Sequence, residues 1–301
     1  MSKFHHFAFI AFPKLVALLL GLSTLVSCTL SVIEEPVEQK SRVLVDVRPF
    51  HLAAEDFGAA TRTAGAPATR LSFAVFDKEG NLVESVMSLE SSDGSFGTVE
   101  MELYPGSYKM VAVAHSGDAD ADVQSTTSVI LPGTTFTDTF VDTQELSVVS
   151  GQDCSLSMTL PRVTSAFVLR LADTTPPADA KEIQVEVNYS ALEPTSLDLN
   201  PATGLVTNNW KQTRVIPIED FVEGEDIPVY FIGMFPTETW PVTVKATAFA
   251  TDGTEIISHT INNVPLAPNQ KTIATGTFFK SQGSGTFTIV TTWGDDIEIE
   301  Y

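Results

Sequence analysis

The sequence predicts an all-β protein. Beyond residue 40, apolar residues recur with a period close to two, which is typical of strands that bury one face. No stretch of a dozen residues carries the apolar stripe of an amphipathic helix. Turn-forming Asp, Gly, Asn and Pro residues separate the alternating stretches. We therefore expect antiparallel sheets, and a length of 301 residues favours two domains over one.

Residues 1–27 predict a secretory signal peptide. They carry two lysines and an apolar run from Leu15 to Val26, which is too short to cross a hydrocarbon core of roughly 30 Å as a helix. Ser27 and then Cys28 follow this run, and the arrangement resembles the lipobox of bacterial lipoproteins, whose cysteine becomes the acylated amino terminus. We expect lipid, such as palmitate, on Cys28. The alternative is a plain signal peptide that ends near a cysteine.

Residues 28–41 predict a tether between the lipid and the first domain. The segment Thr29–Lys40 is polar and contains Glu34, Glu35 and Pro36, a composition typical of flexible linkers. Several acyl chains anchor a protein stably, because each buried methylene contributes about 0.8 kcal/mol. Such lipid would hold the chain at a membrane surface.

Residues 42–152 predict a first β-sandwich. The alternation is clearest at Val43, Val45 and Val47, and a turn at Asp77–Asn81 indicates a hairpin. The expected strands are 42–50, 71–76, 82–89, 98–103, 107–115, 123–131 and 136–149.

Residues 153–301 predict a second β-sandwich, and the turn residues Ser150–Asp153 form the break between the two domains. No fixed-period repeat is present, which disfavours a solenoid or a propeller. The expected strands begin near Leu156 and continue through 163–171, 182–189, 214–218, 227–235, 242–250, 255–261, 271–279, 285–293 and 297–301.

The charge of the chain excludes some partners. The formal net charge is −21, and it becomes −23 when the two signal-peptide lysines leave. Nucleic acids and anionic lipid headgroups are bound through clustered Lys and Arg, and we find no basic patch in the sequence. With Cys28 acylated, Cys154 has no disulfide partner, and we expect it to act as a small buried apolar residue.

The sequence carries no motif for catalysis, a cofactor or a metal. His51, His115 and His259 are too scattered for a known metal spacing, and we expect them at the surface or bonded at strand ends. No nucleophile elbow, phosphate loop or dinucleotide fingerprint occurs. The acidic run Asp118–Asp122 lacks the Gly and Glu of a helical calcium loop, and we interpret it as a solvated loop.

Three tryptophans leave two interpretations open. Trp210, Trp240 and Trp293 could form an aromatic platform for a sugar. Core filling is the more common fate of tryptophan in a sandwich, and we favour it here.

Four segments carry a resemblance that covers nearly the whole chain. They are the lipobox Leu25–Cys28, LSFAVFDKEGNLV at Leu71–Val83, LYPGSYKMVAVA at Leu103–Ala114 and LSMTLPRVTSAFVLRL at Leu156–Leu171. In this order they resemble the fimbrillin superfamily, the fimbrial subunits and anchors of certain anaerobic Gram-negative bacteria. The resemblance implies two transthyretin-like antiparallel β-sandwich domains in tandem.

The resemblance also implies a mode of assembly. In donor-strand exchange, a sandwich that lacks one strand accepts an extended segment of a neighbouring subunit. In polymerising members an arginine-specific protease removes the first strand. Here that strand would be Arg42–Phe50, and Arg62 or Arg70 would be the processing point. An arginine that is never cut is the alternative. The stretch Gly285–Tyr301 is either a donor strand or the last strand of the second domain.

We therefore expect a non-enzymatic surface lipoprotein, a subunit or anchor of a fimbrium (pilus) with a role in cell adhesion. Its partners would be other fimbrial subunits, in a homo- or heteropolymer, and the outer membrane. The alternative is a glycan-binding outer-membrane lipoprotein of a polysaccharide-uptake system. An enzymatic interpretation has no motif in its support.

Lipidation can be tested by the intact mass and amino terminus of the protein extracted from cell envelopes. We expect a chain that begins at an acylated Cys28, and a Cys28→Ser variant without the acyl mass. A start at Thr63 or Leu71 without lipid would instead indicate cleavage after Arg62 or Arg70. An unmodified start elsewhere would contradict the lipobox.

Overall fold

The structure is a computed structural model in which residues 1–37 and 38–301 form two separate units. The described residues all belong to the second unit, and Cys28, His51 and Arg62 lie outside them. The described ranges are 38–49, 68–89, 96–132, 137–172, 175–188, 191–192, 196–206, 210–221, 226–232, 240–279 and 287–292.

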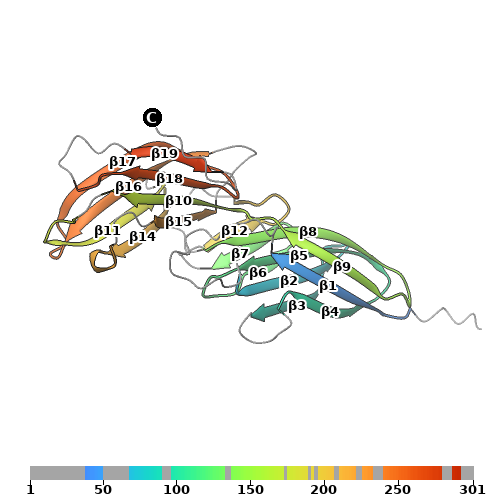
Figure 1. The fold of residues 1–301 in the computed structure, drawn as a ribbon. Coiled ribbons are helices and arrows are strands. Elements are labelled where there is room, and N and C mark those ends of the chain that lie inside the picture. The colour runs from blue at the N-terminus through green and yellow to red at the C-terminus, as the bar shows by residue number, and fades with distance from the viewer. Residues whose placement is uncertain are drawn as a thin grey trace, which may run out of the picture. The chain divides into compact units, whose positions relative to one another are not determined.

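The predicted all-β class is confirmed (Figure 1). Apart from one 3-10 turn, η1 (Ile218–Asp220), the regular elements in the described ranges are strands. They are β1 (Ser41–Pro49), β2 (Arg70–Asp77), β3 (Leu82–Leu89), β4 (Thr98–Leu103), β5 (Gly106–His115), β6 (Asp122–Ser125), β7 (Ser128–Pro132), β8 (Thr139–Val148), β9 (Cys154–Leu160), β10 (Thr164–Leu171), β11 (Ala180–Val187), β12 (Ser196–Asn200), β13 (Leu205–Val206), β14 (Gln212–Pro217), β15 (Asp226–Ile232), β16 (Trp240–Ala250), β17 (Glu255–Leu266), β18 (Lys271–Gly276) and β19 (Phe287–Thr292).

Two sheets share one hydrophobic core near the amino-terminal end of the described chain. Their strand orders are β4-β1-β9 and β3-β2-β5-β8. The alternate positions predicted to face inward do so. In β4, for example, exposed and buried residues alternate along the whole strand. Large side chains of both sheets, among them Phe73, Met110, Phe140 and Met158, are fully buried in this cluster. Together they remove enough apolar surface from water to hold the two sheets against each other.

A second core joins the remaining sheets. The orders β15-β10-β18-β19 and β14-β11-β16-β17 describe the two sheets formed by the later strands. Residues such as Phe167, Ile183, Val244 and Phe278 are buried in this cluster. Phe76 and other residues on the opposite face of the β3-β2-β5-β8 sheet belong to it as well. That sheet is therefore covered on both faces, which explains why six consecutive residues of β2 are buried.

Two strands pair with partners that the alternation pattern does not reveal. β9, which the sequence analysis assigns to the second domain, pairs in parallel with β1. β12 pairs with β7 and extends the β6-β7 hairpin to the order β13-β12-β7-β6. Periodicity identifies which face of a strand is buried and not which strand lies beside it. The division into domains at residue 152 stays a prediction.

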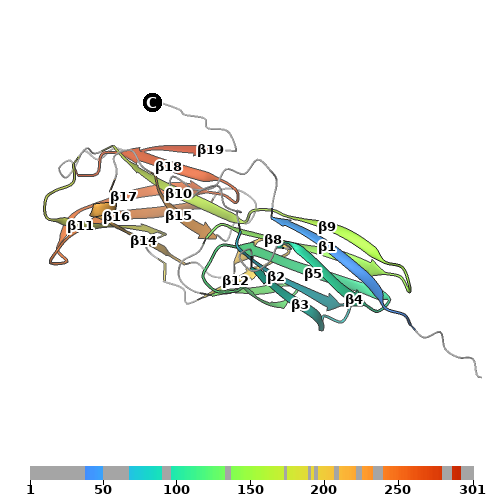
Figure 2. The same cartoon turned by 60° about the horizontal axis from the view of Figure 1, so that its bottom comes forward.

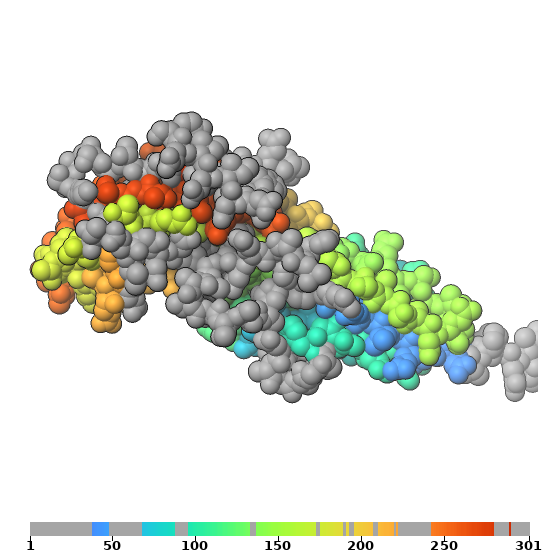
Figure 3. Space-filling model, viewed as in Figure 1, coloured from blue at the N-terminus to red at the C-terminus, as the bar shows by residue number. Residues whose placement is uncertain are grey.

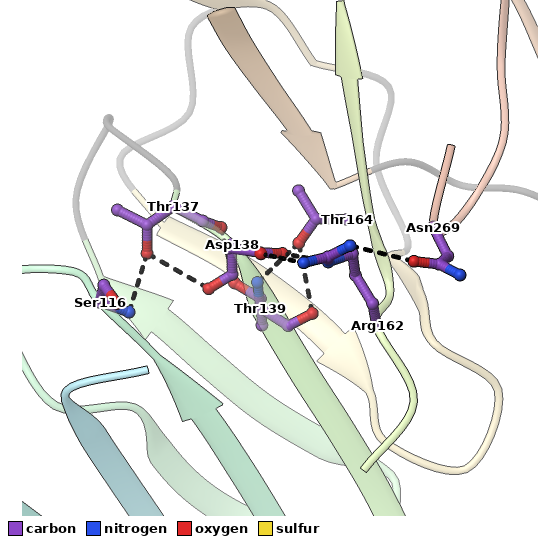
Figure 4. A network of polar contacts seen from close by, with 7 residues as sticks. All are labelled: Ser116, Thr137, Asp138, Thr139, Arg162, Thr164 and Asn269. Carbon is purple, nitrogen blue, oxygen red and sulfur yellow. Dashed lines mark hydrogen bonds and ion pairs between the residues drawn. The ribbon is translucent and has the colours of Figure 1, made fainter. Parts of the chain in front are cut away.

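A buried ion pair ties three separate segments of the chain together (Figure 4). Arg162, between β9 and β10, donates from Nε to Asp138 Oδ1 at 2.7 Å and from Nη2 to Oδ2 at 2.6 Å. Its Nη1 donates to Asn269, in the turn between β17 and β18, at 3.1 Å. The side chains of Arg162 and Asp138 are 3% and 8% exposed. The guanidinium also lies 5.2 Å from the centre of the Phe140 ring.

The surrounding backbone is satisfied by threonine hydroxyls. The backbone N–H of Thr139 donates to Thr164 Oγ1 at 2.7 Å, and that of Ser116 donates to Thr137 Oγ1 at 3.0 Å. A bidentate pair with these added hydrogen bonds offsets much of the cost of burying two charges. Losing one partner of the pair would leave the other charge buried and uncompensated.

Replacing Arg162 with Ala should therefore lower the free energy of unfolding by about 3–5 kcal/mol, as measured by urea denaturation. Lys181→Ala, which removes the exposed cation beside Glu182, is the control and should change it by less than about 1 kcal/mol. A double variant, Arg162→Met with Asp138→Leu, should lose less than Arg162→Ala alone. Equal losses for Arg162→Ala and Lys181→Ala would contradict this role.

Candidate functional site

The first strand, β1, is hydrogen-bonded along both of its edges (Figures 1 and 2). It runs antiparallel to β4, with Val45 opposite Val99, and parallel to β9, with Val45 opposite Leu156. β1 is thus the central strand of its sheet, although it is the first strand of the described chain. Residues 50–67 lie between β1 and the next described range, which begins at residue 68. The next strand, β2, belongs to a different sheet.

The inward face of β1 is made of valines. Val43 and Val45 are fully buried and Val47 is 2% exposed. All three belong to the core cluster that the two amino-terminal sheets share. Full burial of a valine side chain contributes about 1.5–3 kcal/mol relative to leaving it in water. β1 therefore holds its place by hydrogen bonds on two edges and by three buried side chains on one face.

The outward face of β1 meets carboxylates. Arg42 donates from Nε to Glu100 Oε1 at 2.6 Å and from Nη2 to Oε2 at 2.8 Å, and its backbone N–H donates to Asp153 Oδ1 at 3.1 Å. The hydrogen bond from Arg42 lowers the pKa of Glu100, and the bond to Glu100 raises the pKa of Arg42. Figure 3 shows atoms of β1, in blue, at the surface beside those of β9 in yellow-green.

Both ends of β1 are fixed by specific contacts. At its start, the Ser41 hydroxyl donates to the carbonyl of Val149 at 2.7 Å and accepts from the backbone N–H of Gln152 at 3.2 Å. Near its end, the N–H of Val47 donates to the carbonyl of Gly97 at 2.6 Å. Gly97 has φ +88°, and a Cβ there would lie 2.6 Å from the Val47 oxygen. Only glycine allows this close approach without strain.

Arg70, one of the two predicted processing points, is the first residue of β2. Its backbone pairs with Leu89 on one side and His115 on the other. Its Nε donates to the carbonyl of Gly117 at 2.7 Å, and its Nη1 donates to Asp120 at 2.6 Å. Arg70 is thus held inside a sheet. The other two predicted site residues, Cys28 and Arg62, lie outside the described residues.

His115 is the last residue of β5 and is bonded there, as expected for a histidine at a strand end, but its deep burial was not predicted. It is 5% exposed, and its Nδ1 accepts from the N–H of Gly117 at 3.0 Å. Burial, with a smaller contribution from the positive charge of Arg70, lowers its pKa from 6.5 to about 4. His115 is therefore neutral at pH 7. His259 is half-buried and bonded through Nε2 to the carbonyl of Phe278 at 2.9 Å, but it lies within β17 and not at a strand end as expected.

The other sequence candidates do not gather into a site. Trp210 is 2% exposed, which confirms its interpretation as a core residue, whereas the side chains of Trp240 and Trp293 lie outside the described ones. Cys154 is a half-buried free thiol beside Val43. Within the described ranges, no three His, Cys, Asp or Glu residues lie close enough to hold a metal ion. No helix among these residues is long and apolar enough to cross a membrane.

A family model matches residues 49–301, and its description is a family of unknown function (DUF6562). A comparison with curated proteins finds no match.

Solved structures are similar to this one over most of its length. A candidate cell adhesion protein from Bacteroides eggerthii aligns with a TM-score of 0.51 at 10% identity, covering 84% of this chain and 95% of that one. The fimbrial anchor protein Mfa2 and the tip fimbrial protein Mfa3, both from Porphyromonas gingivalis, align at 12% identity with TM-scores of 0.48 and 0.45. Both alignments cover 84% of this chain, and they cover 97% and 98% of the other.

The predicted resemblance is thus confirmed at the level of the fold, since identities this low show the fold alone.

The buried His115 predicts a dependence of stability on pH. Its native pKa lies below the 6.5 of the unfolded chain, so the unfolded chain takes up a proton first as the pH falls. Stability should therefore be lost between pH 6.5 and 4, with about 2 kcal/mol of the unfolding free energy lost between pH 7 and 5.

Urea denaturation at pH 7 and pH 5 measures this loss. A His115→Gln variant should lose that part of the pH dependence. The comparison uses the change in unfolding free energy between pH 7 and pH 5, so it does not depend on the absolute stability of the variant. His259→Gln is the control and should keep the loss. If His115→Gln loses as much unfolding free energy between pH 7 and pH 5 as the native protein, other groups cause the pH dependence.

Proposed function

The chain belongs to the family of unknown function DUF6562, and we propose that it is a non-enzymatic cell-surface protein that takes part in building fimbriae. The fold it shares with a candidate cell adhesion protein supports a surface role. Proteins named as a fimbrial anchor and a fimbrial tip align over similar lengths. In this proposal the two pairs of sheets correspond to two transthyretin-like sandwiches, and acylated Cys28 anchors the chain in the outer membrane.

The position of β1 is the observation that carries the proposal. Because β1 lies between β4 and β9, its removal would leave two strands with unpaired backbone groups facing each other. It would also leave an apolar floor where Val43, Val45 and Val47 now pack. An extended segment with apolar residues at every second position can fill such a groove, since backbone hydrogen bonds provide affinity and side chains fix the register.

Assembly would require a cut between β1 and β2. Of the two arginines considered, Arg70 has a paired backbone and a bonded side chain. A protease needs an extended, unpaired substrate, so this geometry favours Arg62 as the processing point. An anchor subunit would keep β1 and the lipid instead of being cut.

The proposal can be tested with a chain that carries a specific protease site inserted among residues 53–61. After cleavage, β1 is held only by non-covalent contacts, and a labelled peptide of residues 41–50 should exchange into its place. A Val45→Asp peptide should bind at least about a hundredfold more weakly, because it would bury an unpaired carboxylate. Fluorescence anisotropy measures both affinities.

A Leu44→Thr peptide provides the control, because it changes a half-buried side chain on the outward face and should bind within a few-fold of the native peptide. The uncut protein should bind none of the three. If the native peptide does not exchange into the cut protein, β1 is a permanent part of the fold and the proposal is wrong.

A further inference from the structure

Acidic residues lie beside one end of β1. We call Glu100, Glu102 and Asp153 the acidic rim of the β1 position. Glu102 lies directly opposite Arg42 on β4, and Glu100 lies opposite Leu44. Asp153 accepts a hydrogen bond from the backbone N–H of Arg42 at the start of β9. Three carboxylates thus surround this end of β1, and the Arg42 guanidinium bonds one of them, Glu100, through two hydrogen bonds.

On the basis of the proposed function, we propose that this groove selects a donor strand with a basic residue at the position of Arg42, supplied by a different protein rather than by the carboxyl-terminal stretch of a second copy of this chain. An incoming strand that lacks the cation would leave Glu100 without the two charged hydrogen bonds that Arg42 donates to it, beside Glu102 and Asp153. An acidic incoming strand would add like charges across a strand pair, where neighbouring side chains lie about 5 Å apart.

The carboxyl-terminal stretch of this chain has the wrong charge for its own groove. Ile297, Ile299 and Tyr301 alternate with Glu298 and Glu300. If the three apolar residues take the positions of Val43, Val45 and Val47, a glutamate takes the position of Leu44. This holds for either direction of the strand. That glutamate then faces Glu100 directly, because Leu44 and Glu100 are partners in the register.

The net charge acts in the same direction. Two copies of this strongly acidic chain repel one another, whereas a donor from a basic protein is attracted. Specificity depends on the difference in affinity between partners, and charges that oppose the wrong partner contribute to it. The pattern of apolar residues sets the register, and the acidic rim discriminates between donors of equal apolar pattern.

Four labelled peptides offered to the cleaved full-length chain test this inference. They are residues 41–50, the same peptide with Arg42→Glu, residues 292–301, and the latter with Glu298→Lys and Glu300→Lys. At low ionic strength we expect Arg42→Glu to weaken binding about tenfold and the two lysines to strengthen binding of the 292–301 peptide by a similar factor. Both differences should shrink in 1 M salt.

Protein variants locate the effect. Glu100→Lys should reverse the preference, so that the Arg42→Glu peptide binds more tightly than the native one. Glu145→Lys makes the same change in net charge at an exposed position on β8. This strand belongs to the facing sheet, and its Leu146 and Val148 pack in the same core as the valines of β1. It should leave the order of the peptides unchanged.

The outcomes separate the two proposals. If all four peptides bind equally, strand complementation stands and the selection by charge is overturned. If Glu145→Lys changes the preference as much as Glu100→Lys, net charge and not the rim is responsible, which also overturns it. If the native peptide itself fails to bind, the proposed function is wrong and this inference falls with it.

Discussion

The structure depends on the pairing of one strand with two others. β1 supplies the hydrogen bonds that connect β4 to β9, which are partners of β1 and not of each other. Its three valines complete the core that the two amino-terminal sheets share. Contacts at Ser41 and Gly97 fix its two ends. Because β4 and β9 are joined through β1, this sheet forms only when a strand occupies the β1 position.

The fold class and most strands could be predicted from the sequence, because alternation is a local signal. Val43, Val45 and Val47 are buried as their spacing indicates. The partners of β9 and β12 could not be predicted, since the alternation of apolar residues does not show which distant strand lies alongside. The Arg162–Asp138 pair was equally hidden, because two charged residues 24 positions apart carry no pattern.

The candidate site shows the same division between local and distant information. The alternation of apolar residues identified the first strand, and the resemblance singled out the two arginines after it. It did not reveal that Arg70 is bonded to Gly117 and Asp120, because these residues lie 47 and 50 positions away. The carboxylates beside Arg42 come from β4 and from the turn before β9, and only the register brings them together. Charge at a strand rim therefore has to be determined from pairing rather than from composition.

The pairing of β1 with β9 also constrains the order of events when the chain is made. Arg42 and Asp153 are 111 positions apart, so β1 emerges long before the strand that will lie beside it. Contacts between such distant segments slow folding, because a long loop must close first. During that interval the valine face of β1 has no complete partner, which is the state in which apolar strands aggregate or bind a chaperone. This sheet therefore cannot be completed until the chain has been made as far as β9.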